Sequence, residues 1–136
     1  MLSEFPSYAS FFLLIAAAFG AIGVITGAFG AHALEGRISA DRLQTWQTAV
    51  LYQFIHAILL FGIALLILFL FGRGVEIGLL KWAGYLAIAG VFIFSGSLYA
   101  LCLSGIKWLG AITPIGGVLF IISWFLVALS AMRLMR

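Results

Sequence analysis

Charged residues are scarce in this sequence. Only 8% of its 136 residues are Asp, Glu, Lys or Arg, whereas 65% are hydrophobic and 15% are aromatic. A water-soluble domain usually carries about a quarter charged residues, so the composition excludes that class of protein. It also excludes an intrinsically disordered chain, because disordered chains are poor in apolar residues.

Cysteine and clusters of basic residues are scarce as well. The single cysteine, Cys102, cannot form a disulfide within the chain, so the redox compartment cannot be read from it. The net charge of +3 comes from seven basic residues scattered between apolar runs, not from a basic stripe of the kind that binds nucleic acid. We therefore expect no nucleic-acid partner and interpret the basic residues as flanking charges of segments in a lipid bilayer.

The sequence also lacks the parts that catalysis and active transport need. Its apolar runs contain no carboxylate, and we find no nucleophile elbow, phosphate-binding glycine loop or basic cluster for a phosphorylated substrate. These absences indicate a protein that is not an enzyme. A four-helix monomer is small for a pore, although an oligomer could build one at an interface.

Four long runs without charged residues make up most of the sequence. No Asp, Glu, Lys or Arg occurs in residues 5–34, 43–72, 82–106 or 108–132. A membrane-spanning helix needs about 20 apolar residues, and each run is longer. The sequence predicts one transmembrane domain, residues 1–136, with helices at approximately 8–34, 45–71, 80–104 and 108–132.

The connections between these runs are short, at 35–42, 73–81 and the single residue Lys107. Short connections force neighbouring helices to run antiparallel. We therefore predict an all-α, up-down-up-down four-helix bundle with both termini on one side. Ser39 and Asp41 are residues that can cap the start of the second helix.

The basic residues give a weak prediction of orientation. The side with the termini holds Arg73, Lys81, Arg133 and Arg136, and the other side holds Arg37, Arg42 and Lys107. Because loops rich in Lys and Arg stay in the cytoplasm, four against three favours cytoplasmic termini. The AHA sequence at 31–33 resembles a signal-peptide cleavage site, but no basic residue precedes it and the apolar run is too long. We expect the first helix to be retained.

Four glycines of the first span lie on one helical face, at spacings of three, four and three: Gly20, Gly23, Gly27 and Gly30. In lipid, small residues form helix-packing surfaces because they let backbones approach closely. We interpret this face as a packing surface. A groove in which a ligand lies against bare backbone is the alternative.

Polar residues of the four spans fall in the membrane half away from the termini. With alternating helix directions, that half holds His32, Tyr52, Gln53, His56, Ser95, Tyr99 and Thr113, and the other half is nearly unbroken Leu, Ile, Phe and Ala. The asymmetry predicts a polar pocket in this half. Hydrogen bonding of each side chain across the bundle, with no ligand, is the plainer interpretation.

The two histidines raise the question of a metal or a bis-histidine haem. His32 closes the first span at the interface, and His56 lies roughly 8 Å deeper at 1.5 Å per residue. No cysteine pair, histidine pair or paired carboxylate completes a site. We therefore expect no metal and no haem, and keep a site for a lipid or quinone head group, or for protons, as the functional alternative.

Several motifs together resemble one family. GAFGAHAL at 27–34, Trp46, YQ at 52–53, HA at 56–57, FSGSLY at 94–99, TPIGG at 113–117 and Trp124 occur in this order. The chain thereby resembles the domain of unknown function 423 family, the YgdD/YwdK-type small inner-membrane proteins. The resemblance implies a four-helix protein of the bacterial cytoplasmic membrane, and it implies no activity. Its motif residues include the seven polar residues of the predicted pocket.

From the sequence we predict a non-enzymatic membrane protein that binds a lipid, a quinone or another small amphipathic molecule in the polar pocket. A homo-oligomer is compatible with this function. Two alternatives stay open: an accessory subunit that packs its glycine face against a larger membrane complex, and a small oligomeric transporter or channel.

Overall fold

The computed structural model describes residues 6–135, which form four long helical segments without strands. The elements are α1 (Ser7–Phe29), a π-helical turn η2 (Gly30–Leu34), α2 (Ala40–Leu70), α3 (Gly78–Ser104), a 3-10 helix η3 (Lys107–Ala111) and α4 (Thr113–Leu134). All four segments are long and apolar enough to cross a membrane. The predicted all-α membrane bundle is confirmed.

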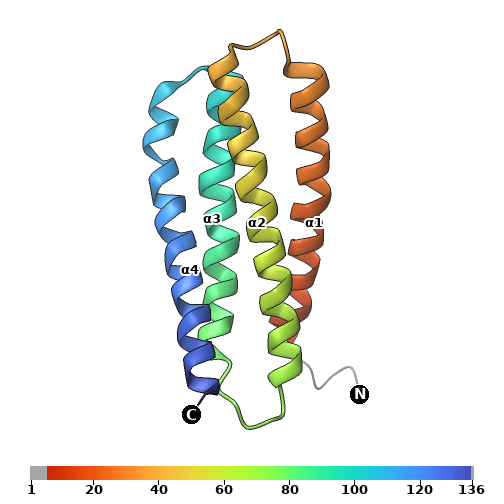
Figure 1. Cartoon of the computed structure of the whole chain (residues 1–136), viewed down its shortest axis with the longest axis vertical. Coiled ribbons are helices and arrows are strands. Elements are labelled where there is room, and N and C mark those ends of the chain that lie inside the picture. The colour runs from red at the N-terminus through yellow and green to blue at the C-terminus, as the bar shows by residue number, and fades with distance from the viewer. Residues whose placement is uncertain (1–5, 136) are drawn as a thin grey trace.

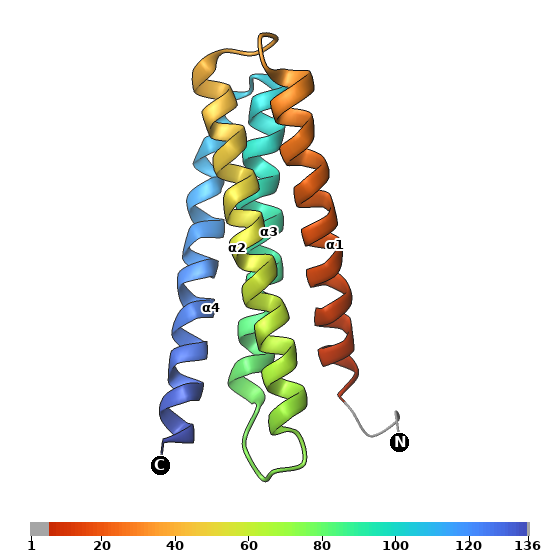
Figure 2. The same cartoon turned by 45° about the vertical axis from the view of Figure 1, so that its right-hand side comes forward.

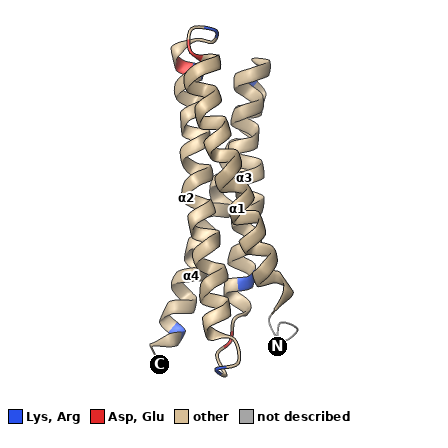
Figure 3. Cartoon of the chain, turned by 90° about the vertical axis from the view of Figure 1, so that its right-hand side faces the viewer, with Lys and Arg blue, Asp and Glu red and all other residues tan. Residues whose placement is uncertain are grey.

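The helices alternate in direction, and the start of α1 and the end of α4 lie at the same end of the bundle (Figure 1). We call this the terminal end and the opposite one the distal end. The charged residues lie at or near these two ends and leave the middle of the bundle uncharged (Figure 3). Arg136, which entered the predicted charge count, lies outside the described residues.

Helix boundaries differ from the prediction mainly at the distal end. α2 begins at Ala40 instead of residue 45, because the Ser39 side chain accepts a hydrogen bond of 3.3 Å from the Arg42 backbone N–H and caps a polar first turn. The first span ends in the π-helical turn η2, and the fourth begins with the 3-10 helix η3. Hydropathy alone cannot detect either change of helix type.

Two helices, α2 and α3, form a central pair that we call the spine, and α1 and α4 are its two flanks. α2 and α3 pack together and lie between α1 and α4 (Figures 1 and 2). α1 packs mainly on α2, and α4 mainly on α3. Side chains on opposite faces of the α2/α3 pair therefore meet different partners, which decides how the polar residues are distributed.

Apolar packing fills the terminal half of the bundle. Phe12 of α1, Leu60 and Ile67 of α2 and Leu80 of α3 are fully buried there. A smaller apolar cluster of Leu34, Trp46 and Cys102 lies at the distal end. The two clusters leave the intervening region to polar and aromatic side chains.

Glycines allow the closest helix contacts. On the face that the sequence singled out, added Cβ atoms would lie 2.9 Å from the Phe54 ring at Gly23, 3.5 Å from Val50 at Gly27 and 2.6 Å from Trp46 at Gly30. These three glycines therefore face α2 of the same chain. Gly20 differs, because a Cβ atom there would meet no described atom within 4 Å.

Gly116 and Gly117 give a matched test of the α3/α4 contact. A Cβ atom on Gly116 would lie 2.5 Å from the Phe94 backbone nitrogen, whereas one on Gly117 would lie 3.9 Å from the Phe94 ring. Because backbone cannot move aside cheaply, we expect Gly116→Ala to lower the free energy of unfolding by about 1–3 kcal/mol. Gly117→Ala should have little effect. Unfolding in mixed micelles measures both, and equal stabilities would contradict this packing.

Candidate functional site

The structure does not gather the seven predicted residues around one pocket. Gln53 and Tyr99 face α1, Tyr52 and His56 face α4, and the α2/α3 pair separates the two groups. His32 is exposed in η2 and belongs to neither group. The seven residues therefore do not line one common pocket in the structure, because the neighbours Tyr52 and Gln53 point to opposite flanks of the spine.

On the α1 side, four residues form what we call the tyrosine network: Thr26, Trp46, Gln53 and Tyr99. The Tyr99 hydroxyl donates to Oε1 of Gln53 at 2.7 Å, and it lies 3.2 Å from the Thr26 hydroxyl. Nε2 of Gln53 donates to the backbone carbonyl of Phe19 at 2.8 Å. This network connects α1, α2 and α3.

Trp46 fixes the distal end of this network. Its indole N–H donates to the Thr26 carbonyl at 2.8 Å, close to the point where α1 changes to the π-helical turn. The Trp46 and Tyr99 ring centroids are 4.6 Å apart. Gly30 leaves the space for the indole ring, so the GAFGAH motif and Trp46 form one packing unit.

Sequence reasoning did not include Thr26 in the site. Its signal was available, since Thr26 is the only hydroxyl-bearing residue between positions 11 and 34. A threonine in an apolar span can hydrogen-bond a neighbouring helix as well as its own backbone. Thr26 does both.

On the α4 side, five rings form what we call the histidine cluster: Tyr52, His56, Phe94, Phe120 and Trp124. His56 is 3% exposed. Its Nδ1 lies 2.8 Å from the Tyr52 carbonyl, and its Nε2 accepts from the Trp124 indole N–H at 3.2 Å. Because a carbonyl oxygen only accepts, Nδ1 carries the hydrogen, and this arrangement holds a neutral imidazole with both nitrogens paired.

The two histidines that raised the question of a metal or a haem lie in different parts of the structure. A neutral histidine binds a metal through its unprotonated nitrogen, and in His56 that nitrogen pairs with Trp124. His32 lies at the end of α1, on the other flank. Within residues 6–135, no three His, Cys, Asp or Glu residues gather as a metal site would need.

Two features of the predicted polar half need correction. His56 lies near the middle of α2, deeper than the sequence argument placed it. The terminal half is not purely apolar, because Ser123 and Ser130 of α4 are buried there. The Ser123 hydroxyl donates to the Ala83 carbonyl of α3 at 2.8 Å. Single serines in apolar runs gave no periodic signal in the sequence.

The other predicted polar residues connect α3 to its neighbours. The Ser95 hydroxyl donates to the Ala49 carbonyl of α2 at 2.7 Å. The hydroxyls of Ser97 and Thr113 are 2.7 Å apart and connect α3 to α4. Through these bonds the FSGSLY and TPIGG motifs lie side by side at the distal end.

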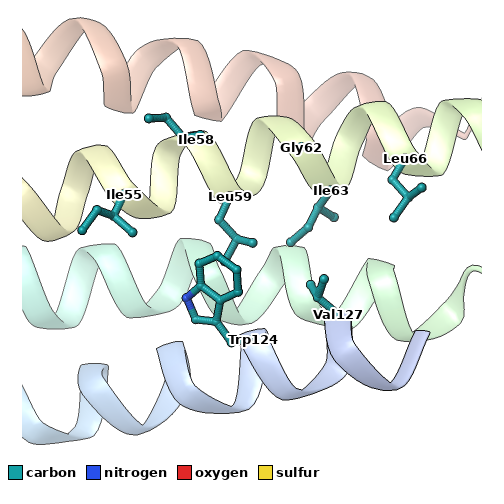
Figure 4. A pocket seen from close by; sticks show the side chains of 8 residues that line it. All are labelled: Ile55, Ile58, Leu59, Gly62, Ile63, Leu66, Trp124 and Val127. Carbon is teal, nitrogen blue, oxygen red and sulfur yellow. The ribbon is translucent and has the colours of Figure 1, made fainter. Parts of the chain in front are cut away.

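A long groove lies between α2 and α4 beside the histidine cluster. One hollow, of about 440 Å³, is lined by Ile55, Ile58, Leu59, Gly62, Ile63, Leu66, Trp124 and Val127 (Figure 4). A second, of about 390 Å³, is lined by Tyr52, Ile55, His56, Phe94, Gly117, Phe120, Ile121 and Trp124. Ile55 and Trp124 line both hollows, so the two adjoin at these residues, and we call them together the α2/α4 groove.

Tyr52 differs from the other polar residues of the candidate site. Its side chain is 38% exposed, and among the described residues nothing hydrogen-bonds its hydroxyl. Helical side chains lean toward the helix N-terminus, which for α2 is the distal end. By contrast, every buried side-chain nitrogen and oxygen in residues 6–135 has a partner. The Tyr52 hydroxyl is therefore a free donor at the distal end of the groove.

A family model described as a protein of unknown function (DUF423) matches residues 26–117. The chain is 46% identical over 122 residues to UPF0382 membrane protein SAB0533 of Staphylococcus aureus, covering 90% of this chain and 95% of that protein. It is also 46% identical over 122 residues to UPF0382 membrane protein YwdK of Bacillus subtilis, covering 90% and 96%. No solved structure matches the chain.

The two tyrosines of the candidate site give a matched test of the tyrosine network. Tyr99→Phe leaves the buried Gln53 oxygen without its donor, so we expect the free energy of unfolding to fall by about 1 kcal/mol. Tyr52→Phe removes an unpaired hydroxyl and should change it by less than about 0.5 kcal/mol. Equilibrium unfolding in mixed micelles measures both. The interpretation fails if Tyr52→Phe is the more damaging change.

Proposed function

The chain belongs to the DUF423 family of membrane proteins, as its motifs indicated, and from its own surfaces we propose that it binds one amphipathic molecule of the bilayer, such as a lipid or a quinone, in the α2/α4 groove. The molecule's hydrocarbon chain lies along the groove. The proposal assigns no catalytic step and no cofactor. It moves the binding site from the predicted common pocket to the α4 flank of the spine.

The observation that carries this proposal is the length over which the two adjoining hollows follow α2. On α2 the lining runs from Tyr52 to Leu66, which corresponds to about 21 Å at 1.5 Å per residue. That is most of the roughly 30 Å hydrocarbon core. A groove of this length along the membrane normal fits an extended chain better than a compact solute.

The chemistry of the lining supports a hydrocarbon chain. Its middle is built from Ile55, Ile58, Leu59, Ile63 and Leu66 of α2. Because lipid tails are as apolar as these side chains, binding depends on van der Waals contact rather than on release of water. A chain lying in a groove contacts protein on several sides, whereas a chain on a flat helix surface contacts it on one.

The alternative function, an accessory subunit of a larger complex, has less support than the sequence suggested. It required the glycine face of α1 to be an outward docking surface, but Gly23, Gly27 and Gly30 face α2 of the same chain. A larger complex or a homo-oligomer would need another surface. A helix of a partner protein seated in the α2/α4 groove would exclude the chain of a lipid, so the same experiment separates the two functions.

We further propose that the protein resides in the bacterial cytoplasmic membrane with its termini in the cytoplasm. The relatives from Staphylococcus and Bacillus, which are named membrane proteins, support the location. The described basic residues divide three to three between the ends, and Arg136 is the fourth on the terminal side of the sequence. That count supports the orientation.

Gly62 offers a direct test of the groove. A Cβ atom on Gly62 would meet no described atom within 4 Å, and the same holds for Gly20 on the other side of α2. We expect Gly62→Leu to fill the groove and reduce the co-purifying amphipathic molecule at least tenfold. Gly20→Leu, which adds the same side chain between α1 and α2, should retain it.

Native mass spectrometry of gently extracted protein, followed by chemical identification of the released molecule, measures this difference. Equal retention by the two variants would refute binding in the α2/α4 groove. A bare wild-type protein that co-purifies with a stoichiometric partner protein would favour the accessory subunit instead.

Cysteine labelling tests the orientation. Gln44→Cys places an exposed thiol at the distal end and Met135→Cys places one at the terminal end, and neither changes the charge count. In whole cells we expect a membrane-impermeant maleimide to label only Gln44→Cys, with Met135→Cys reacting after lysis. The native Cys102 is fully buried and serves as the unreactive background. The reverse pattern would show termini outside the cytoplasm.

A further inference from the structure

We propose that the head group of the bound molecule is an uncharged, planar ring bearing a carbonyl oxygen, as in a quinone, and that Tyr52 donates a hydrogen bond to that carbonyl. This inference rests on the proposed binding of an amphipathic molecule in the α2/α4 groove. It narrows the ligand from any bilayer lipid to one chemical class.

The depth of Tyr52 argues against a charged head group. α2 has 31 residues, about 46 Å at 1.5 Å per residue, so it exceeds the roughly 30 Å hydrocarbon core by about 8 Å at each end. Tyr52 lies twelve residues after Ala40, about 18 Å along the helix, so its backbone lies about 10 Å inside the hydrocarbon and its side chain leans from there toward the distal end. A phosphate head group bound beside Tyr52 at this depth would lose its hydration shell.

The groove offers no counter-charge that could compensate for this loss. None of the residues that line its two hollows is Asp, Glu, Lys or Arg. His56 is the only titratable nitrogen in the lining, and both of its ring nitrogens are already paired. A charge without a partner is costly in the membrane interior. The head group that fits here is neutral.

Aromatic rings give the distal part of the groove flat walls. Tyr52 and Phe94 stack with centroids 4.5 Å apart at 24°, and His56 and Phe120 stack at 3.4 Å and 9°. The Tyr52 and Trp124 side chains stay 38% and 48% exposed. Their uncovered ring surfaces favour a planar partner, because aromatic groups attract each other in offset or edge-to-face contact. A branched glycerol ester has no such plane.

The Tyr52 hydroxyl supplies the polar contact. It is a donor without a partner among residues 6–135, and the hydrocarbon around it holds no water to accept its hydrogen. A carbonyl oxygen on the ligand satisfies this donor. The proposal concerns binding only and includes no electron transfer.

The test uses the full chain in nanodiscs of phosphatidylcholine with two probes. One is a naphthoquinone with a geranylgeranyl tail, and the other is the hydrocarbon of that tail, which has neither a ring nor an oxygen. We expect Tyr52→Phe to weaken naphthoquinone binding about five- to tenfold, the effect of one hydrogen bond. Binding of the tail hydrocarbon should not change.

Tyr85→Phe is the matched control, because the Tyr85 side chain is also 38% exposed but lies near the terminal end of α3, away from the groove. It should leave the affinity for both probes unchanged. Gly62→Leu should abolish the binding of both probes, since it occupies the space of the tail. Thermal unfolding of each variant establishes that the variants are folded.

Two failures can be told apart. If Gly62→Leu weakens the binding of both probes but the Tyr52→Phe variant binds the naphthoquinone as tightly as wild type, the ring proposal is wrong and the proposed binding of the tail stands. The same conclusion follows if the naphthoquinone binds no more tightly than the tail hydrocarbon. If Gly62→Leu changes neither probe's binding, the proposed function is wrong and the ring proposal falls with it.

Discussion

The structure depends on one constraint: a polar group inside a bilayer has to find its partner within the protein. Each buried polar side chain of the candidate site meets it with a bond to another helix, as Tyr99 does with Gln53 and His56 with Trp124. Ser95 and Ser123 reach backbone carbonyls of a neighbouring helix. The polar residues therefore connect the bundle first, and a function that uses them has to work with side chains that are already paired.

This constraint also explains why the motifs occur together. The indole of Trp46 requires both a carbonyl, which Thr26 supplies, and space, which Gly30 leaves. Phe94 likewise requires Gly116, since their backbones approach too closely for a Cβ atom. Glycine, aromatic ring and polar group form a unit in each case. The groove between α2 and α4 borders one of these units, and Tyr52 is the polar residue there whose hydroxyl was left free.

The sequence was sufficient for the spans and insufficient for the site. The positions of Lys81 and Lys107 limit where α3 can cross the membrane, and Ser39 is a recognisable cap. Which flank a side chain faces depends on the rotation of each helix about its axis. Tyr52 and Gln53, about 100° apart on α2, separate to opposite flanks for this reason. The sequence prediction grouped Tyr52 and Gln53 by their depth in the membrane alone. Depth could not indicate that Trp124 would pair with His56 either.

The spine with two flanks has a consequence for the order of assembly. Chains are synthesised from the N-terminus, so Thr26 can meet Trp46 as soon as α2 follows α1 into the membrane. His56 enters with α2 as well, but its partner is on α4, the last helix made. Its Nε2 therefore lacks its native donor until the final helix docks. The histidine thereby couples completion of the chain to completion of the bundle, and arrival of α4 also forms the second wall of the groove.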